Sequence, residues 1–463
     1  MSVSGKYDRA AEQIHEASIA LLQNPGIGID HDEIRSLLLK RGARPGTRND
    51  SVRLPTELIA EALAQCPKQF DLTDRSGAPT RLSAVSEPVF WSCPGMFLHR
   101  SDEHRLFTSR DMAAMSRLLH HLDHVQAVFG MSLDDVPPPA RDVVGLQVMA
   151  KNTSKHLRVL CFSPEGAEAL TRMKPVVGKH PWFSVGFTAH GPLRWTGLAL
   201  EIFRKTAGHG IPVSVNGEPM AGASGPATLA GAAAVGNAEI LAGLVVNQLL
   251  EPGRPCIYNL GLAHIFDMRA AVAVTGGPEN ALLAQISARM GRYYDLPSAS
   301  WVSTEALSPD GQAALEKMFG FHSHMESGVN CIWGVGQLES ELAISPEQAV
   351  IDNEMIGFAL RYRRGFTTSA DALAVEVTRA VGIAGSFLDQ EHTAAHCRSE
   401  FFMPNVLFRG RRAADAGGTD HLKKRAEEIA AAEMAKPPEN GLSADQARAL
   451  DTIAADFLRR IAG

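Results

Sequence analysis

The sequence contains no C-x-x-C pair and no block of clustered cysteine and histidine residues. Its six cysteines are scattered singly along 463 residues, at Cys66, Cys93, Cys161, Cys256, Cys331 and Cys397. Single cysteines in a long chain are typical of reduced, buried thiols, whereas zinc–thiolate sites and disulfide frameworks need clustered or regularly spaced ones. We therefore expect no zinc–thiolate site and a cytoplasmic location.

A basic block and an apolar leader are also missing. The formal net charge is −6 and the charges are dispersed, which excludes the electrostatic footprint of a nucleic-acid-binding protein. Residues 1–9 lack the apolar core of a signal peptide, and no apolar run reaches the length of a membrane span. We expect neither a nucleic-acid partner nor a membrane partner, and we expect a homo-oligomer.

The amino-terminal part of the chain has helical patterns. Apolar residues recur at helical spacing over 7–25, and residues 31–41 and 55–65 form two shorter helical patterns. Thr108 has the side chain of an N-cap for a further helix that ends near Leu122. These features predict a helical amino-terminal region, with a lid segment, over residues 1–122.

Eight short apolar runs alternate with helical segments along the chain. They are Val125–Met131, Leu157–Phe162, Trp182–Phe187, Ile211–Asn216, Cys256–Leu260, Ser298–Ser303, Asn330–Gly334 and Gly385–Leu388. Such runs are typical of a parallel sheet covered by helices. Eight is the strand count of a TIM (β/α)8 barrel, so we predict this α/β fold for residues 123–410 and a helical extension for residues 411–463. An open doubly wound sheet is the alternative, although no nucleotide fingerprint follows the first run.

The most distinctive segment is glycine-rich and lies between a strand pattern and a long helical pattern. Ile211–Asn216 has the pattern of a strand, Gly222, Ser224 and Gly225 follow in a turn, and residues 227–250 are strongly helical. A helix that starts just after a strand offers free N–H groups to an anion, so this turn is a candidate anion-binding turn. Close packing of the helix on its strand explains the glycines equally well.

This segment resembles the same element in the trimethylamine methyltransferase family, and other segments agree with that family in order. They are Thr108–Asp111, Asn152–Lys155, Phe266–Arg269, Gly277–Glu279, Tyr293–Pro297, Ser308–Gln312, Gly328–Asn330 and His392–Glu400. The resemblance covers most of residues 15–435. It implies a TIM barrel that moves a methyl group from a methylated amine to the cobalt of a separate corrinoid protein. It also implies that this partner supplies the cobalamin and that no cofactor binds tightly to the chain itself.

One departure from the family concerns pyrrolysine, which the founding members carry near the end of the seventh strand. The matching stretch here, Asn330–Glu339, consists of standard residues, and the equivalent position lies within Gly336–Glu339. The task proposed for pyrrolysine is to make a tertiary or secondary amine cationic, because the amine is otherwise a poor leaving group. A quaternary ammonium is already cationic. The departure therefore favours glycine betaine or a related betaine as substrate, with trimethylamine as the alternative.

Candidate site residues follow from the rule that such a barrel binds its ligand where strands end and loops begin. The rule gathers His190, Asn216, Glu218, Tyr258, His264, Trp301, Glu305, Trp333, Gln337 and His392. Aromatic residues make up only 6% of the chain, yet three of these are large aromatics, whose ring faces attract a quaternary ammonium. We expect Trp333 and Tyr258 to share one barrel mouth, with packing in the barrel end as the alternative. We expect His392 or the anion-binding turn to hold the betaine carboxylate.

Histidine pairs suggest no metal site. His392, His396 and Glu400 are spaced four residues apart and would share one face of a helix, but a metalloprotease would have glutamate directly after the first histidine. The family that the chain resembles uses no catalytic zinc. His120 and His121 have the pattern of a helix surface, so we expect no metal ion.

Two other classes of function stay open. The first is a barrel that binds betaines without turnover. The second is a hydrolase or lyase that uses Glu218, His190 or His264 as its acid or base, although no pair of carboxylates has a diagnostic spacing.

Overall fold

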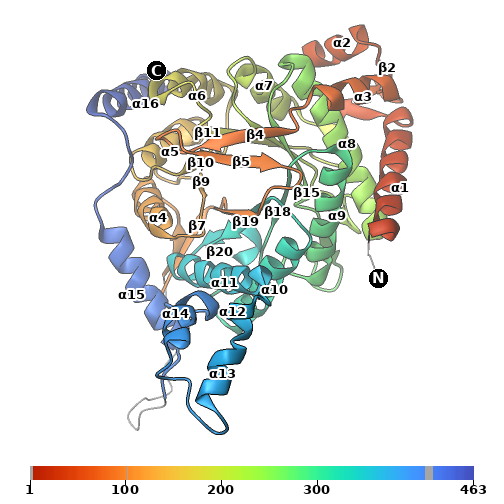
Figure 1. The fold of residues 1–463 in the computed structure, drawn as a ribbon. Helices are drawn as coiled ribbons and strands as arrows, with labels where there is room; N and C mark the ends of the chain where they lie inside the picture. The colour runs from red at the N-terminus through yellow and green to blue at the C-terminus, as the bar shows by residue number, and fades with distance from the viewer. Residues whose placement is uncertain (1–3, 102, 412–420, 463) are drawn as a thin grey trace.

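The computed structural model describes residues 4–101, 103–411 and 421–462 and contains a closed barrel of eight parallel strands (Figure 1). In chain order the strands are β6 (Val89–Ser92), β9 (Ala127–Phe129), β10 (His156–Arg158), β11 (Phe183–Thr188), β13 (Val213–Asn216), β15 (Cys256–Gly261), β18 (Ser298–Trp301) and β19 (Cys331–Val335). Each strand pairs with the next barrel strand in the chain, and β19 pairs with β6 to close the barrel. The predicted TIM barrel fold is confirmed.

One helix follows each barrel strand, and these helices form the outer layer. They are α4 (Ser109–His121), α5 (Arg141–Ala150), α6 (Pro164–Val177), α7 (Gly197–Thr206), α8 (Leu229–Leu250), α9 (Pro278–Tyr294), α10 (Gly311–Glu326) and α11 (Pro346–Arg364). As predicted, Thr108 is the N-cap of α4. It forms a capping box with Asp111, in which each side chain bonds the other residue's backbone N–H.

The barrel starts one strand earlier than the sequence indicated. Its first strand, β6, lies in the segment that we assigned to a lid, and Gly385–Leu388 is not a strand but irregular chain between two helices. β6 is only four residues long, which is too short for its apolar pattern to be distinguished from loop packing. With β6 as the first strand, β19 is the eighth strand and not the seventh.

Amino-terminal additions cover one side of the barrel and its amino end. The predicted helices are α1 (Ser4–Gln23), α2 (Asp32–Lys40) and α3 (Thr56–Gln65), beside a small sheet of β1 (Ile27–Ile29), β2 (Arg44–Pro45), β3 (Ser51–Arg53) and β12 (Arg194–Trp195). The hairpin of β4 (Gln69–Thr73) and β5 (Pro79–Ser83) places Leu72 and Leu82 in the same apolar cluster as side chains of the barrel interior. This hairpin plugs the amino ends of the strands.

Helix α8 is long and apolar enough to cross a membrane by length and composition, contrary to our expectation that no run reaches that length. In the structure, 83% of its apolar window is buried inside the protein, because α1 and α3 pack on the side that faces away from the barrel. On the barrel side a glycine allows close packing, because a Cβ atom at Gly243 would lie 2.5 Å from the ring of Trp195 of β12. The apolar residues of α8 therefore form part of the protein core.

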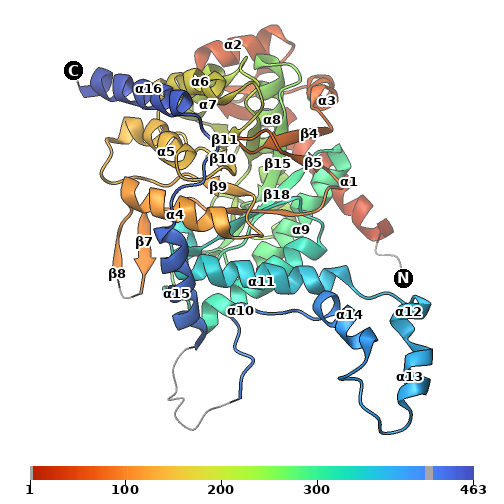
Figure 2. The same ribbon diagram turned by 60° about the vertical axis from the view of Figure 1, so that its left-hand side comes forward.

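The carboxyl-terminal part begins with an arm that extends away from the barrel (Figure 2). The arm contains α12 (Ala370–Leu373), α13 (Val375–Val381) and α14 (Glu391–Glu400), and it leaves Phe366, Ile383 and Leu388 exposed. The chain then returns as α15 (His421–Ala435), which packs on α4 and α11, and α16 (Ala444–Ala462), which packs on α5 and α6.

Short strands in the loops after the barrel strands form two further small sheets. One contains β14 (Met220–Ala221), β16 (His264–Asp267) and β17 (Val272–Val274), and the other contains β7 (Phe97–Arg100), β8 (Glu103–Leu106), β20 (Gln337–Leu338) and β21 (Ala343–Ile344). Because they follow the carboxyl ends of the barrel strands, these sheets build the rim of the barrel mouth.

A buried ion pair holds the loop after β19 against the outer helices. Lys317 of α10 and Asp352 of α11 are both fully buried, with Nζ and Oδ2 2.7 Å apart. The Lys317 ammonium also donates to the carbonyl oxygens of Gly334 and Gln337, at 2.8 and 3.0 Å. The Asp352 carboxylate accepts the N–H of Gly336 at 2.7 Å. Both charges are thus satisfied by the backbone that leads to Gln337.

We predict that Lys317→Met lowers the free energy of unfolding by about 3–5 kcal/mol, because it leaves the Asp352 carboxylate buried without its counter-ion. Adding Asp352→Leu should restore part of this loss, since no buried charge then remains. Urea denaturation followed by circular dichroism measures both changes.

Lys205→Met is the matched control, because Lys205 pairs at 3.2 Å with a half-exposed carboxylate, that of Glu168. Its loss should stay within about 1 kcal/mol. A loss for Lys317→Met that is no larger than the loss for Lys205→Met would contradict the structural role of the buried pair.

Candidate functional site

Inward-facing side chains give the barrel an aromatic half. Trp91, Phe129, Trp301 and Trp333 belong to one buried cluster, supplied by β6, β9, β18 and β19. The rings of Trp91 and Trp333 stack with centroids 5.9 Å apart, and Phe129 meets Trp333 edge to face at 5.3 Å. This half of the interior is closely packed and apolar.

The other half of the interior is polar and contains a buried arginine. Arg158, at the end of β10, is only 3% exposed, and its Cζ lies 5.7 Å from the ring centre of Trp333. Gly186 makes room for it, since a Cβ there would lie 1.5 Å from the guanidinium. Burial lowers the pKa of Arg158 to about 9, so it stays charged at neutral pH.

No carboxylate in the described part of the chain pairs with Arg158. Its Nη2 lies 3.4 Å from the hydroxyl oxygen of Ser214, while Nε and Nη1 have no hydrogen-bond partner among the described residues. Ser214 donates in turn to the Oδ1 of Asn216, which also accepts from Asn259 at 3.2 Å. Asn216 donates to the hydroxyl of Thr188 at 3.1 Å. The arginine is thus positioned by a polar network but keeps free donors.

Trp301 and Gln337 link the aromatic half to the mouth. The indole N–H of Trp301 donates to the side-chain oxygen of Gln337, which is fully buried. The amide Nε2 of Gln337 and the indole Nε1 of Trp333 are buried without a partner in the described structure. Buried polar groups are normally satisfied, so this group of unpaired donors indicates a bound ligand or ordered water.

Three carboxyl groups interact electrostatically around the mouth. Glu218 follows β13, Glu239 lies on α8 and Glu341 lies in the loop after β19. Burial raises the pKa of Glu218 to about 7. Burial and the Glu218 charge raise the pKa of Glu239 to about 7 and that of Glu341 well above its usual value. A cation at the mouth would favour the ionised form of each.

The structure separates Tyr258 from the site. Ile257 belongs to the inner cluster, whereas Tyr258 belongs to the outer core, where its hydroxyl donates to the Oδ1 of Asn237 on α8 at 2.9 Å. Its ring packs against Tyr294 of α9. The expectation that Tyr258 and Trp333 share one mouth is wrong, because neighbouring residues of a strand face opposite sides of the sheet.

Two predicted histidines also lie away from the inner cluster. His392 is on α14 in the arm, where its Nε2 bonds the backbone oxygen of Asp371 at 3.0 Å. It is therefore not brought to the barrel mouth. His190 is at the end of β11 but is exposed. The backbone N–H of His190 donates to the carbonyl oxygen of Arg194.

The glycine-rich turn does not present free amides in the expected way. The N–H of Gly222 donates to the carbonyl of Gly225, and the N–H of Gly225 donates to that of Met220. The Ser224 hydroxyl accepts the N–H of Met220 at 2.8 Å. The turn is closed on itself, and α8 starts beyond it at Leu229. These amides therefore do not form the predicted anion-binding turn.

Two other candidates hold the loops in place. Glu305 accepts the N–H groups of Thr275 and Gly276 and the hydroxyl of Ser340, so it ties three loops together. His264 is buried at the start of β16, where its Nδ1 lies 3.0 Å from the carbonyl oxygen of Leu262. Burial lowers the pKa of His264, so its imidazole is neutral at neutral pH.

Sequence reasoning missed three charged residues of the site, although each left a signal. Arg158 interrupts an apolar strand pattern, and Glu239 is a charged residue within the long apolar helix α8. A charge inside a buried element is uncommon unless it is paired or functional. Glu341 left only a weak signal, because it lies in a loop.

The fold and the site together define a barrel enzyme whose ligand enters at the carboxyl ends of the strands. The chain belongs to the trimethylamine methyltransferase (MTTB) family, whose model matches residues 6–461. It is a methyltransferase. The resemblance seen in the sequence is confirmed.

Several curated proteins are similar to the chain over most of its length. A trimethylamine methyltransferase MttB of Desulfitobacterium hafniense (strain DSM 10664 / DCB-2) is 29% identical, with 86% of this chain and 82% of that protein covered. One of Methanosarcina barkeri is 30% identical, with 82% and 80% covered. A glycine betaine methyltransferase of D. hafniense (strain Y51) is 29% identical, with 85% of each covered.

A solved structure supports the fold. The crystal structure of the Methanosarcina barkeri monomethylamine methyltransferase MtmB superposes with a TM-score of 0.54, covering 97% of this chain and 87% of that one at 13% sequence identity.

We predict that a permanent cation binds more tightly as the pH rises from 6 to 8. Glu218 and Glu239, with pKa values raised to about 7, are largely protonated below this range and ionised above it. A cation stabilises the ionised forms, so affinity should rise by up to about tenfold per pH unit for each coupled proton. Calorimetric titration with tetramethylammonium measures this change.

Glu218→Gln should flatten the profile, whereas Glu305→Gln should not, because the loop amides hold the Glu305 carboxylate. An affinity of the wild type that stays constant between pH 6 and 8 would contradict a role of these carboxylates in cation binding.

Proposed function

We propose that the protein transfers a methyl group from a carboxylate-bearing quaternary amine, such as glycine betaine, to cob(I)alamin on a partner corrinoid protein. The observation that carries this proposal is the pairing of opposite charges in one site. A buried guanidinium with free donors lies inside the barrel, and three carboxyl groups lie around its mouth.

The carboxylates suit the cationic end of the substrate. Glu218, Glu239 and Glu341 come from three different elements, and burial together with the Glu218 charge raises the pKa of the other two. A quaternary ammonium has no N–H to donate, so it is recognised by charge and by apolar contact and not by hydrogen bonds. The carboxylates would orient the ammonium toward the rim, where a partner protein can approach.

Arg158 suits the other end of the substrate. Its unpaired Nε and Nη1 can each donate to a carboxylate oxygen, and hydrogen bonds between an ionised donor and an ionised acceptor are the strong ones. In this orientation the substrate carboxylate lies deep in the barrel and the methyl groups point outward. A zwitterion therefore fits the charge pattern better than trimethylamine does.

The cob(I)alamin of the partner supplies the nucleophile, and the residues of this chain have only to bind and orient the methyl donor. The leaving group is a neutral tertiary amine, so no general acid is needed. Holding the methyl in line and removing water from the cation account for the contribution of the barrel. The trimethylamine methyltransferases among the relatives make trimethylamine the alternative substrate.

Relatives named trimethylamine methyltransferase and glycine betaine methyltransferase are about equally similar to this chain, so direct assay must decide between the substrates. We expect methyl transfer from glycine betaine, proline betaine or carnitine and none from trimethylamine. The assay combines the chain, a corrinoid protein with cob(I)alamin and each amine, and it follows both the cob(I)alamin absorbance and the demethylated amine. Turnover of trimethylamine alone would exclude the betaine proposal. Binding of betaine without demethylation would favour the betaine-binding alternative.

Arg158→Gln should weaken glycine betaine binding by about 10–100-fold, because a charge-assisted hydrogen bond contributes about 1.5–3 kcal/mol. Tetramethylammonium has no carboxylate, so its affinity should hardly change, and it serves as the matched control ligand. Calorimetry on both ligands makes the comparison within one folded variant. Equal losses for the two ligands would show that Arg158 supports the barrel and does not bind the carboxylate.

A further inference from the structure

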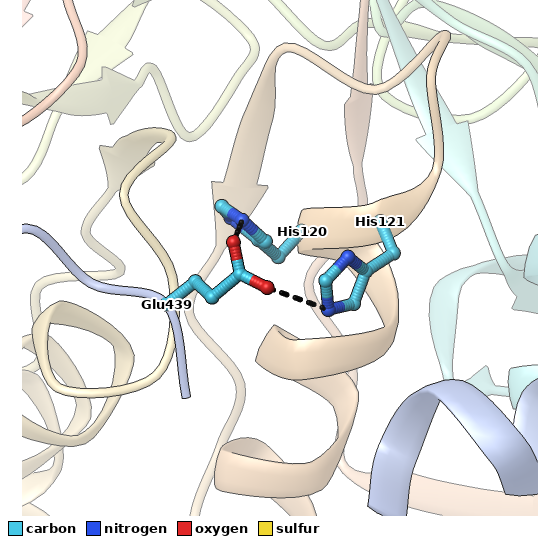
Figure 3. A group of neighbouring side chains, drawn as sticks. All are labelled: His120, His121 and Glu439. Carbon is cyan, nitrogen blue, oxygen red and sulfur yellow. Dashed lines mark ion pairs between the residues drawn. The ribbon is translucent and has the colours of Figure 1, made fainter. Parts of the chain in front are cut away.

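A cluster of two histidines and a glutamate lies outside the barrel, where α4 meets the segment between α15 and α16. Figure 3 shows His120 and His121, the last two residues of α4, on either side of the Glu439 carboxylate. The side chains of His120 and His121 are 15% and 17% exposed, while Glu439 is 64% exposed. The backbone of Glu439 is fixed by a bridge to Thr153.

The distances in this cluster are too long for direct hydrogen bonds. The Nε2 of His120 lies 3.5 Å from one Glu439 oxygen, and the Nε2 of His121 lies 3.9 Å from the other. Hydrogen bonds of this kind measure about 2.7–3.2 Å between heavy atoms. The His121 Nε2 is buried and has no hydrogen-bond partner among the described residues. The His121 Nε2 therefore faces the Glu439 carboxylate without a hydrogen bond, and the contact of His120 with the same carboxylate is long.

The same distances suit a shared metal ion. Ligand atoms about 2.0–2.1 Å from a tetrahedral zinc ion are about 3.3–3.4 Å apart, and here the two histidine Nε2 atoms lie 3.5 and 3.9 Å from the Glu439 oxygens. One ligand atom from each of the three residues lies within 4.8 Å of the other two. We propose that His120, His121 and Glu439 bind one divalent transition-metal ion, with solvent as the fourth ligand.

Surrounding groups orient His120 for this role. Its Nδ1 lies 3.2 Å from the hydroxyl of Thr153 and 3.4 Å from the N–H of Ser154. The Ser154 N–H donates to Nδ1, and these contacts fix the ring so that Nε2 faces Glu439. Metal binding through Nε2 would move the ring proton to Nδ1, which would then donate to the Thr153 hydroxyl in place of accepting from Ser154. Two imidazoles and one carboxylate favour zinc or a similar ion over calcium or magnesium.

The nearby charges do not prevent binding. Glu433 approaches the Nδ1 of His121 at 4.0 Å and adds negative charge. The positive charge of Lys155 lowers the pKa of His120 and opposes a cation there. Its ammonium, however, donates to the carbonyl oxygens of Leu119 and Leu122, both at 2.7 Å. The bound ion would clamp the carboxyl-terminal segment to α4, so its role is structural and separate from the barrel mouth.

A second group, formed by Asp371, His392 and His396 in the arm, provides a matched control. There the Nε2 atoms of the histidines lie 3.0 Å from Asp371 oxygens, so these residues already satisfy one another. We expect no stoichiometric metal at this second group.

The experiment titrates the full chain, stripped with a chelator, with Co²⁺, whose visible absorption reports on coordination. We expect one Co²⁺ per chain in the wild type and in His396→Asn, and a weakening of at least about tenfold in Glu439→Gln and in His121→Asn, since loss of an outer partner alone costs 10–100-fold. Zn²⁺ should raise the Tm of the wild type more than that of either variant. Absence of stoichiometric Co²⁺ in the wild type, unchanged affinity in Glu439→Gln, or loss of binding in His396→Asn would overturn the proposal.

Discussion

The buried ion pair between Lys317 and Asp352 fixes the part of the barrel on which the site depends most. Both charges are removed from water, and such a pair is tolerated only when further hydrogen bonds satisfy the remaining donors and acceptors. Those bonds come from the backbone of the loop after β19. Gly334 has to be a glycine there, because its φ is +119° and a Cβ would lie 1.9 Å from the carbonyl oxygen of Val302.

The loop after β19 affects the barrel interior through Gln337. The loop holds this side chain at full burial, where it accepts the indole N–H of Trp301, so the orientation of an aromatic residue of β18 depends on a loop of β19. Trp333, on β19, is held by stacking on Trp91 of β6. The aromatic half of the barrel is therefore rigid, and Arg158 lies beside it with donors that no described side chain uses.

The sequence indicated the barrel fold and seven of its eight strands, but only part of the site. Seven of the predicted apolar runs overlap barrel strands, because strands buried on both sides are continuously apolar. The same continuity hides which residues face inward, and for that reason Tyr258 could be placed at a strand end but not on the correct side of the sheet. The predicted placement of His392 at the barrel mouth was wrong for a different reason. Nothing in its local spacing indicates that the arm extends away from the barrel.

Charged residues within apolar elements would have been the better guide to the site, and under the proposed function they are the groups that hold a zwitterionic substrate. Burial raises the pKa of Glu218 and of Glu239 to about 7, so the two carboxyl groups together carry less than their full negative charge at neutral pH. A cation that binds there shifts both carboxyl groups toward their ionised forms. A protonated tertiary amine would be attracted in the same way, because an alkylammonium titrates at about pH 10 and keeps its proton beside carboxylates of this kind. The carboxylates alone therefore do not separate the two classes of amine. Under the proposed function the discrimination falls to Arg158, whose free donors find a partner only in a substrate that carries a carboxylate.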